Sequence, residues 1–200
     1  MDASQWNDRY RDSELVWSAG PNQFVEAICA DLPPGRSIDL AAGEGRNALW
    51  LAERGWHSTA VDFSDVAIDK MRRIAERRGV DLTGEVADLT TYEPVAAAYD
   101  LVLFNYLQLP ADQLDPILTR AAGAVAPGGT FLLVNHDLAN LDGGYGGPQS
   151  PAVLTTPEQV VAAIGDELVI ERAEIVERRV QTADGERVAL DTLVLARRPG

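Results

Sequence analysis

Three acidic residues could bind a polar or cationic ligand, because each stands at the end of an apolar run typical of a buried strand. They are Asp39, Asp62 and Asp88. Gly43 and Gly45 follow the first acid and precede a helical pattern. A glycine turn between a strand and a helix lets a ligand approach the backbone and directs the helix N-terminus toward it. The spacing therefore predicts a ligand crevice at the carboxyl edge of a parallel sheet.

The glycine turn fits two kinds of ligand. Residues 43–48 match the G-x-G-x-x-A pattern of dinucleotide-binding loops, and Asp62 lies at about the distance expected of a ribose-binding acid. Asp39, however, precedes the turn at a place where a carboxylate would repel a pyrophosphate and attract an ammonium or a sulfonium. We therefore expect a ligand that carries an ammonium and a sulfonium, with a nicotinamide-dependent oxidoreductase as the less favoured alternative.

A regular alternation of strand and helix patterns positions these acids. Strands are expected at 37–40, 57–61, 81–87, 99–104 and 130–134, and helices at 21–31, 47–54, 65–78, 112–125 and from 157. This alternation predicts right-handed βαβ units and hence a doubly wound, Rossmann-like α/β fold with a mostly parallel sheet. Ser64 should cap the helix 65–78 and Gly79 should end it, while Thr156 and Gln159 should form a capping box.

The C-terminal part has a different pattern. Residues 167–180 and 186–197 are long β-rich runs, and the turn signal Ala183-Asp184-Gly185 lies between them. They predict an antiparallel β-hairpin, which brings the expected sheet to seven strands.

The acidic composition limits the expected partners. The formal net charge is −14, whereas nucleic-acid binders gain affinity from Lys and Arg, as do proteins that bind anionic membranes. We therefore expect neither a nucleic acid nor a membrane as partner. No run approaches the about 20 apolar residues of a membrane span, and residues 1–10 lack the layout of a signal peptide. The single cysteine, Cys29, is expected in the core of a cytoplasmic protein.

Five segments together resemble the motifs of the class I S-adenosylmethionine-dependent methyltransferases. They are 39–47 (Asp-Leu-Ala-Ala-Gly-Glu-Gly-Arg-Asn), 61–64 (Val-Asp-Phe-Ser), 87–89 (Ala-Asp-Leu), 99–102 (Tyr-Asp-Leu-Val) and 127–129 (Pro-Gly-Gly). Trp6-x-x-Arg9-Tyr10 and Val16-Trp17 are similar to the opening of the small tellurite-resistance and thiopurine-type methyltransferases. The resemblance implies one methyltransferase domain over residues 1–200, with an N-terminal helical lid segment at 1–34 and an α/β core at 35–200.

The resemblance also implies S-adenosylmethionine as cofactor, S-adenosylhomocysteine as product, and roles for individual residues. Asp39 would hold the cofactor's amino group, with Ala41 and Gly43 offering backbone contacts beside its methionyl part. Asp62 would accept hydrogen bonds from both ribose hydroxyls, because two carboxylate oxygens match a cis-diol. Phe63 would lie against the adenine face.

Further cofactor contacts are implied at the ends of later segments. Asp88 would accept a hydrogen bond from the adenine exocyclic amine, and the Leu89 N–H would serve a ring nitrogen. Asn47, the last residue of the first motif, belongs to the implied cofactor site. Asn105, just past the fourth strand, would line the methionyl pocket.

Methyl transfer from a sulfonium is a direct displacement, so alignment and a dry pocket are the main requirements. Tyr10 and Trp17 would cover the site from the N-terminal segment and exclude water. A base is needed only for a protonated acceptor, and His136, at the carboxyl edge after the fifth strand, is the candidate. Tyr106 and Tyr145 lie in loops on the expected substrate side.

The sequence thus predicts methyl transfer from S-adenosylmethionine to a small-molecule acceptor. A non-catalytic domain that binds an adenosyl cofactor, such as a sensor, is the alternative from another class. His57 and Asp100 begin strands at the opposite edge of the sheet and are expected to be structural. We expect no metal site, because neither histidine has a partner at ligand spacing. We make no prediction of the oligomeric state.

Overall fold

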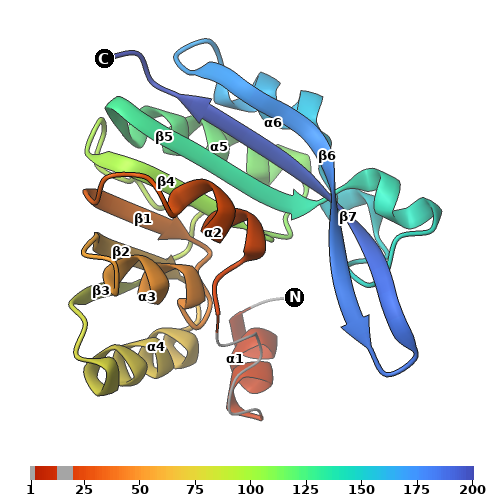
Figure 1. The fold of residues 1–200 in the computed structure, drawn as a ribbon, viewed down its shortest axis with the longest axis horizontal. Coiled ribbons are helices and arrows are strands. Elements are labelled where there is room, and N and C mark those ends of the chain that lie inside the picture. Colours follow the sequence, from red (N-terminus) through yellow and green to blue (C-terminus); the bar gives the residue numbers. More distant parts are fainter. Residues whose placement is uncertain (1–2, 13–19) are drawn as a thin grey trace.

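The computed structural model describes residues 3–12 and 20–200. Within them, seven strands form one sheet in the order β3-β2-β1-β4-β5-β7-β6 (Figure 1). The strands are β1 (Arg36–Leu40), β2 (His57–Asp62), β3 (Leu82–Val86), β4 (Tyr99–Asn105), β5 (Val125–His136), β6 (Val169–Thr182) and β7 (Gly185–Arg197). The first five pair in parallel, and β7 is antiparallel to both of its neighbours. The predicted fold class is confirmed.

Helices cover both faces of the sheet. The α-helices are α1 (Ala3–Arg11), α2 (Gln23–Cys29), α3 (Arg46–Ala52), α4 (Asp65–Arg78), α5 (Ala111–Ala124) and α6 (Pro157–Ile164), and two short 3-10 helices are η1 (Leu138–Asp142) and η2 (Pro151–Val153). The helices α2, α3 and α4 lie on one face, and α5 and α6 lie on the other (Figure 1). None of the described helices is both long and apolar enough to cross a membrane.

The central strands are apolar on both sides because both faces are covered. Leu103 and Leu132 pack toward α2 and α3, in a cluster that includes the buried Cys29. The neighbouring residues Phe104 and Phe131 point the opposite way, toward α5, with ring centroids 6.0 Å apart. Alternate residues of one strand therefore belong to different layers of the core, and the expected burial of Cys29 is confirmed.

The helix-end signals are confirmed with one exception. Ser64 accepts a first-turn N–H of α4 at 3.1 Å, and Gly79 ends that helix with a φ of +66°. Thr156 caps α6, but the predicted capping box is wrong. The side chain of Gln159 donates to Asp115 of α5 at 3.0 Å instead of returning to the cap. This bond ties α6 to α5, which a local sequence pattern does not indicate.

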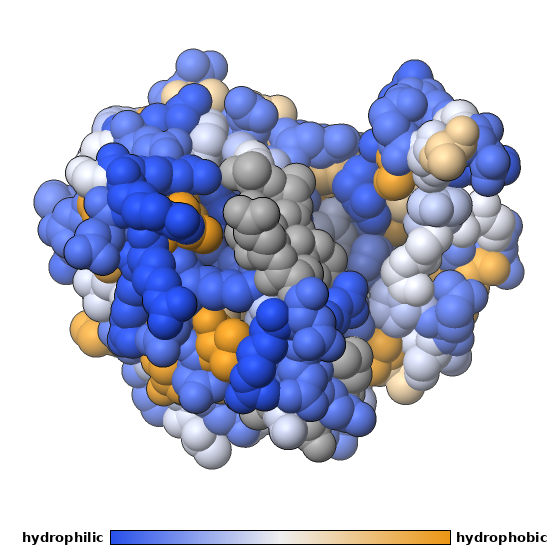
Figure 2. Space-filling view, turned by 90° about the horizontal axis from the view of Figure 1, so that it is seen from below, coloured by the Kyte–Doolittle hydropathy of each residue, from blue (hydrophilic) through white to orange (hydrophobic). Residues whose placement is uncertain are grey.

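β5 and the C-terminal hairpin reach further than expected. β5 continues to His136, and β7 pairs with it only from Asp191 to Arg197. β6 and β7 stay paired with each other as far as their turn. Residues 177–190 therefore extend past the carboxyl edge of the sheet as a two-stranded ribbon, the hairpin arm (Figure 1). The space-filling view shows the hairpin arm standing apart from the body of the molecule (Figure 2).

Candidate active site

A cavity of about 250 Å³ opens at the carboxyl ends of the parallel strands. It lies where β4 follows β3 in sequence but pairs with β1, a reversal of strand order at which α/β sheets bind ligands. The residues with predicted roles that line it are Tyr10, Ala41, Gly43, Asn47, Asp62, Phe63, Asp88, Leu89, Asn105 and Tyr106. The other lining residues are Trp6, Ala42, Arg46, Ala87, Thr90, Leu107, Gln108, Leu109 and Gln113.

The loop after β1 owes its shape to left-handed backbone conformations. Ala41, Gly43 and Gly45 have φ angles of +63°, +56° and +75°. A β-carbon added to Gly45 would lie 2.5 Å from the Cγ and Sδ atoms of Met71 in α4. Glycine at this position therefore allows α3 to begin beside the cavity while packing closely on α4. A non-glycine residue such as Ala41 in this conformation stores backbone strain, which is typical of ligand-binding loops.

Asp62 both shapes this loop and faces the cavity. The N–H of Gly43 donates to its Oδ2 at 2.8 Å, and the N–H of Ser64 donates to its Oδ1 at 2.9 Å. Burial raises the pKa of Asp62, and these hydrogen bonds lower it. A carboxylate oxygen has two lone pairs. Asp62 can therefore still accept hydrogen bonds from the cavity side.

Asp39 lies behind the cavity wall. It is 2% exposed, and neither carboxylate oxygen has a hydrogen-bond partner of normal geometry among the described residues. Burial raises the pKa of Asp39 to about 7, against the lowering effect of the Arg46 guanidinium, while the Asp62 charge raises it further. The nearby Asn47 side chain and Ala48 N–H lower it slightly. A buried carboxylate without a partner is costly, and a hydrogen-bonding cation would offset that cost.

The loop after β3 is held in place by α5. Asp88 is exposed, and its Oδ1 accepts both the N–H and the hydroxyl of Thr90 at 2.8 Å. Arg120 of α5 donates to the carbonyl oxygens of Leu89 at 2.7 Å and Tyr92 at 3.1 Å. Within the described part of the chain, no hydrogen bond engages Oδ2 of Asp88 or the Leu89 N–H. These two groups are therefore available to a ligand.

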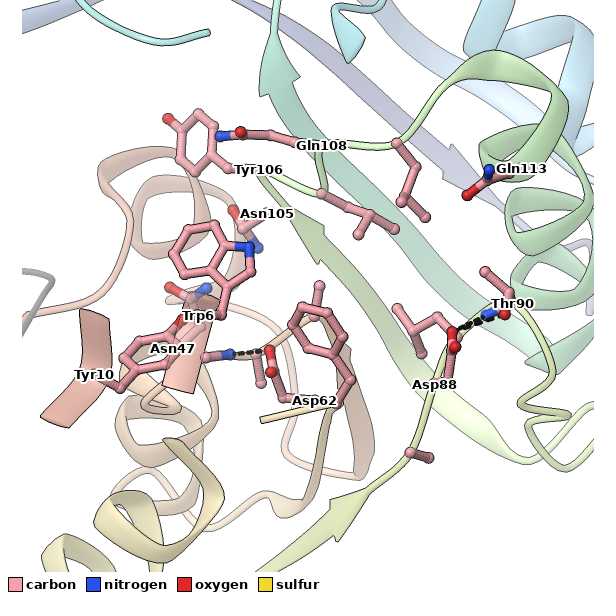
Figure 3. Close-up of a pocket in the computed structure, with 18 of the residues that line it drawn as sticks. Trp6, Tyr10, Asn47, Asp62, Asp88, Thr90, Asn105, Tyr106, Gln108 and Gln113 are labelled. Carbon is pink, nitrogen blue, oxygen red and sulfur yellow. Dashed lines mark hydrogen bonds between the residues drawn. The ribbon is translucent and has the colours of Figure 1, made fainter. Parts of the chain in front are cut away.

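Asn105 and Tyr106 form the other end of the cavity. Both polar atoms of the Asn105 amide are buried and have no hydrogen-bond partner among the residues described. Tyr106 has a φ of +62°, and its hydroxyl donates to Oδ2 of Asp191 at 2.7 Å. Figure 3 shows these two residues on one side of the cavity and Asp88 on the other, with Asp62 between them. The polar groups are thus distributed along the length of the cavity.

The N-terminal helix α1 contributes an aromatic wall. The rings of Trp6 and Tyr10 stack with centroids 5.6 Å apart, and both residues line the cavity (Figure 3). Lys70 of α4 donates to the carbonyl oxygen of Tyr10 and, at 3.1 Å, to Glu44 of the loop after β1. Tyr10 therefore lies at the cavity as the predicted lid requires, whereas Trp17 lies outside the described residues.

The structure does not bring every candidate residue to the cavity wall. His136 packs against Tyr106 with ring centroids 4.6 Å apart, and its Nδ1 lies 3.3 Å from Oδ1 of Asp191. Tyr145 is 44% exposed, and its N–H donates to the carbonyl oxygen of Val188 in the hairpin arm. Neither side chain lines the cavity. Both residues instead lie beside the hairpin arm, which the sequence pattern did not place in space.

Arg46 is the main cavity residue that the sequence analysis left without a role. It belongs to the first motif segment, between Gly45 and Asn47, and this position could have indicated that Arg46 lies at the cavity. At the opposite edge of the sheet, Asp100 accepts the Arg36 N–H at 2.7 Å, in agreement with its expected structural role. Residues 3–12 and 20–200 contain no group of three or more His, Cys, Asp or Glu arranged to hold a metal ion.

A family model described as a methyltransferase domain matches residues 38–129. This span holds the loop after β1 and the three acids Asp39, Asp62 and Asp88. Residues 38–129 carry a methyltransferase domain. The domain has the class I fold, and the resemblance to the S-adenosylmethionine-dependent methyltransferases is confirmed.

Curated relatives of the methyltransferase domain act on different kinds of acceptor. The chain is 26% identical over 137 residues to 2-heptyl-1-hydroxyquinolin-4(1H)-one methyltransferase of Mycobacteroides abscessus, covering 66% of this chain and 60% of that protein. It is 30% identical over 111 residues to ribosomal RNA small subunit methyltransferase C of Alcanivorax borkumensis, covering 52% of this chain and 34% of that protein. The chain therefore spans less than two thirds of the length of either relative.

Solved structures share the fold of the methyltransferase domain over almost its whole length. N-methyltransferase NodS from Bradyrhizobium japonicum WM9, in complex with S-adenosyl-L-homocysteine, superposes with a TM-score of 0.74 at 16% identity, covering 100% of both chains. TehB from Haemophilus influenzae superposes with a TM-score of 0.73 at 17% identity, covering 89% of this chain and 62% of that one.

Proposed function

We propose that this methyltransferase domain binds S-adenosylmethionine in the cavity and transfers its methyl group to a small-molecule acceptor. The observation that carries the proposal is the order of polar groups along the cavity. Oδ2 of Asp88 and the Leu89 N–H stand at one end, Asp62 in the middle, and Asn105 at the other end with Asp39 behind the wall. The cofactor presents matching groups in the same order: an adenine edge, a cis-diol, and an amino acid beside a sulfonium.

The adenosine half of the cofactor fits the loops after β2 and β3. Asp88 accepts from the adenine amine, and the Leu89 N–H donates to a ring nitrogen. Phe63 packs on the adenine ring, since its side chain lines the cavity next to Asp62. Asp62 accepts from both ribose hydroxyls with the lone pairs that the Gly43 and Ser64 N–H groups leave unused.

The methionyl half fits the loop after β1 and the end of β4. Asp39 and Asn105 have buried polar atoms without partners, which suit the ammonium group of the cofactor and its neighbours. Arg46, with its guanidinium beside Asp39, is suited to the cofactor's carboxylate. Asn47 lines this part of the cavity, and its side-chain oxygen already accepts the N–H of Asn22 at 2.8 Å.

When bound, the cofactor supplies a methyl group on an activated sulfonium. The chain's own contribution is alignment and the exclusion of water. Tyr106 and Trp6 bound the cavity on the side of Asn105, and Tyr10 closes it from α1 (Figure 3). These aromatic rings form a dry wall beside the site at which an acceptor meets the methyl group.

A small molecule is the acceptor that the charge of the chain favours. The formal net charge of −14 disfavours approach by a polyanion. The cavity is also walled by α1, which a bulky polymer would have to displace. Among relatives, the quinolinone methyltransferase of Mycobacteroides abscessus is named for a small molecule, while the enzyme of Alcanivorax borkumensis is named for RNA.

Calorimetric titration and a transfer assay test the proposal together. We expect S-adenosylhomocysteine to bind at micromolar concentration and NAD not to bind. We also expect label from methyl-labelled S-adenosylmethionine to appear in small-molecule pools and not in total RNA. Binding of NAD alone would reject the proposed cofactor, and labelling of RNA alone would reject the proposed acceptor class. Cofactor binding without transfer to any pool would favour the non-catalytic alternative.

A further inference from the structure

A buried polar cluster lies at the carboxyl end of β5, and the proposed cofactor contacts do not use it. Its centre is Asp191 of β7, which is 0% exposed. The Tyr106 hydroxyl donates to Oδ2 of Asp191 at 2.7 Å, and Nε of Arg178 donates to the same oxygen at 2.7 Å. Oδ1 lies 3.3 Å from Nδ1 of His136. The cluster thus joins β7, the hairpin arm, β5 and the end of β4.

The sheet itself fixes the spacing between the carboxylate and the imidazole. His136 and Asp191 are direct partners in the antiparallel register of β5 and β7. On its faces, the imidazole ring is held by Tyr106, at a centroid separation of 4.6 Å, and by Gly147. A β-carbon added to Gly147 would lie 3.1–3.2 Å from three ring atoms. The imidazole therefore has little freedom to turn away from Asp191.

The chemistry of the cluster selects one protonation pattern for His136. Burial raises the pKa of Asp191, but the adjacent His136, the hydrogen bonds from Arg178 and Tyr106, and the Arg178 charge hold it below its usual value. An ionised carboxylate only accepts hydrogen bonds. A proton on Nδ1 of His136 would face this carboxylate, and Nε2 would then keep its lone pair. At 3.3 Å, Nδ1 lies within reach of Oδ1 but is not aligned for a hydrogen bond, and catalytic pairs are often poorly aligned before ligands bind.

The cluster borders the acceptor end of the cavity. The ring of Tyr106 lines the cavity beside Asn105, and the same ring packs on His136. Arg178 also lies over this ring, 5.4 Å from its centroid. Nε2 of His136 makes no hydrogen bond with any residue in the described part of the chain. His136 itself does not line the cavity, so an acceptor would have to extend past the Tyr106 ring to reach this nitrogen.

We propose that His136 is the catalytic base of the reaction, that Asp191 is its positioning residue, and that the acceptor is a hydroxyl or thiol of a small molecule. This proposal rests on the proposed function. The lone pair on Nε2 of His136 takes the proton of the acceptor O–H or S–H bond. The acceptor's electron pair forms the new bond to the methyl carbon as the carbon–sulfur bond breaks, with its electron pair remaining on sulfur.

The path of the acceptor's proton explains why a base next to a carboxylate is useful here. His136 becomes an imidazolium held next to the Asp191 carboxylate, and it later releases the proton to water. An acceptor atom without a proton, such as a thioether sulfur or a tertiary amine, needs no base. A buried carboxylate paired with an imidazole is costly to assemble. An acceptor that must lose a proton would give the His136–Asp191 pair a function that offsets this cost.

Nuclear magnetic resonance of the imidazole nitrogens tests the protonation pattern without any acceptor. The chain has two histidines, His57 and His136, so the variant His57→Gln assigns both sets of signals. We expect His136 in its neutral form to be protonated at Nδ1 in the wild type, and Asp191→Asn to disturb this pattern. Protonation of wild-type His136 at Nε2 would overturn the proposal, even if Asp191→Asn fails to fold.

A transfer assay tests the base and the acceptor class. The probes are catechol and 2-mercaptoethanol, which lose a proton on methylation, and dimethyl sulfide and trimethylamine, which do not. We expect transfer to a proton-bearing probe, and a rate about 10²–10⁴-fold lower in His136→Gln, with unchanged affinity for S-adenosylhomocysteine. His57→Gln is the matched control, at the opposite edge of the sheet, and should behave as the wild type.

Two results of this assay would overturn this inference but leave the proposed function in place. They are a wild-type rate in His136→Gln, and transfer to neither proton-bearing probe by a wild type that binds S-adenosylhomocysteine. A wild type that does not bind S-adenosylhomocysteine would instead reject the proposed function.

Discussion

The two ends of the candidate active site are built in different ways. The proposed cofactor end comes from short stretches of chain at the tips of neighbouring strands. Asp39 and Asp62 lie at the ends of β1 and β2, and Asp88 follows β3. The acceptor end is assembled around Asp191 from residues far apart in the sequence, which meet only because β7 inserts between β5 and β6. The proposed cofactor contacts are therefore local in sequence, whereas the proposed acceptor end depends on the tertiary fold.

The two ends also differ in how their polar groups are satisfied. At the cofactor end, Asp39 and Asn105 hold buried polar atoms without partners in the described structure. At the acceptor end, Asp191 accepts hydrogen bonds from Tyr106 and Arg178, whereas Nδ1 of the neighbouring His136 makes none among the described residues. Asn22 connects the two ends, because its N–H donates to Asn47 at 2.8 Å and its amide donates to the Tyr106 hydroxyl at 3.2 Å. The cofactor end is thus prepared for a ligand, and the acceptor end is preorganised by its own contacts.

The largest effect is expected where the cofactor loop depends on packing. Gly45→Ala places a methyl group 2.5 Å from Met71 at a φ of +75°. Strain of about 1–2 kcal/mol and overpacking of about 1–3 kcal/mol should together lower the free energy of unfolding, measured with urea. Gly79→Ala is the control, since its φ of +66° brings the strain but nothing lies within 4 Å. Equal losses in both variants would mean that contact with Met71 does not constrain the loop.

The second largest effect is expected on cofactor affinity, from a substitution at the cofactor end. Asp62→Ala should weaken binding of S-adenosylhomocysteine by about 1–3 kcal/mol, because charged hydrogen bonds to the ribose are lost. Isothermal titration measures this change. Asp100→Ala, the same substitution at the opposite edge of the sheet, should leave the affinity unaltered. An unchanged affinity in Asp62→Ala would refute the ribose role.

The buried carboxylate of Asp39 predicts a pH dependence that the acceptor end should not share. Its pKa is raised from 3.8 to about 7, so its ionised form is disfavoured in the folded protein. A bound ammonium favours that form, so affinity for S-adenosylhomocysteine should rise up to about tenfold per pH unit as pH approaches 7, and then level off. Titration of the wild type and of Asp39→Asn with S-adenosylhomocysteine, from about two pH units below the pKa to about one unit above it, measures this dependence.

The sign for stability is opposite to the sign for binding. Because the folded-state pKa of Asp39 is raised, its contribution to stability is present at low pH and is lost as pH rises from about 4 to about 7. Asp39→Asn should remove both trends. A pH dependence of cofactor affinity that persists in this variant would assign the effect to another group.

The smallest effect is expected from a residue that acts on the cofactor end from a distance. Arg120→Met removes the donors that hold the carbonyl oxygens of Leu89 and Tyr92. The looser loop should weaken cofactor binding by about 1 kcal/mol. Arg172→Met, which removes an exposed guanidinium from β6, is the control for the loss of charge. Equal affinities in the two variants would show that the loop after β3 keeps its shape without α5.

Most of the fold and of the cofactor end could be predicted because the signals are local. Alternating apolar runs indicated the parallel strands, and Ser64 and Gly79 marked both ends of α4. The prediction failed where a side chain had a choice of distant partners, as for Gln159, which bonds to Asp115 instead of its own helix cap. It also gave Tyr145 a position that the structure does not bring to the cavity wall.

The sequence by itself determined the strand-and-helix alternation, the glycine turn and the acids at the strand ends, because each depends on residues next to it in the chain. The tertiary structure alone decided that Asp191 lies beside His136 and Tyr106. That meeting depends on the register of β7 against β5, which is set by pairing across the whole sheet and has no signature in a short stretch of residues.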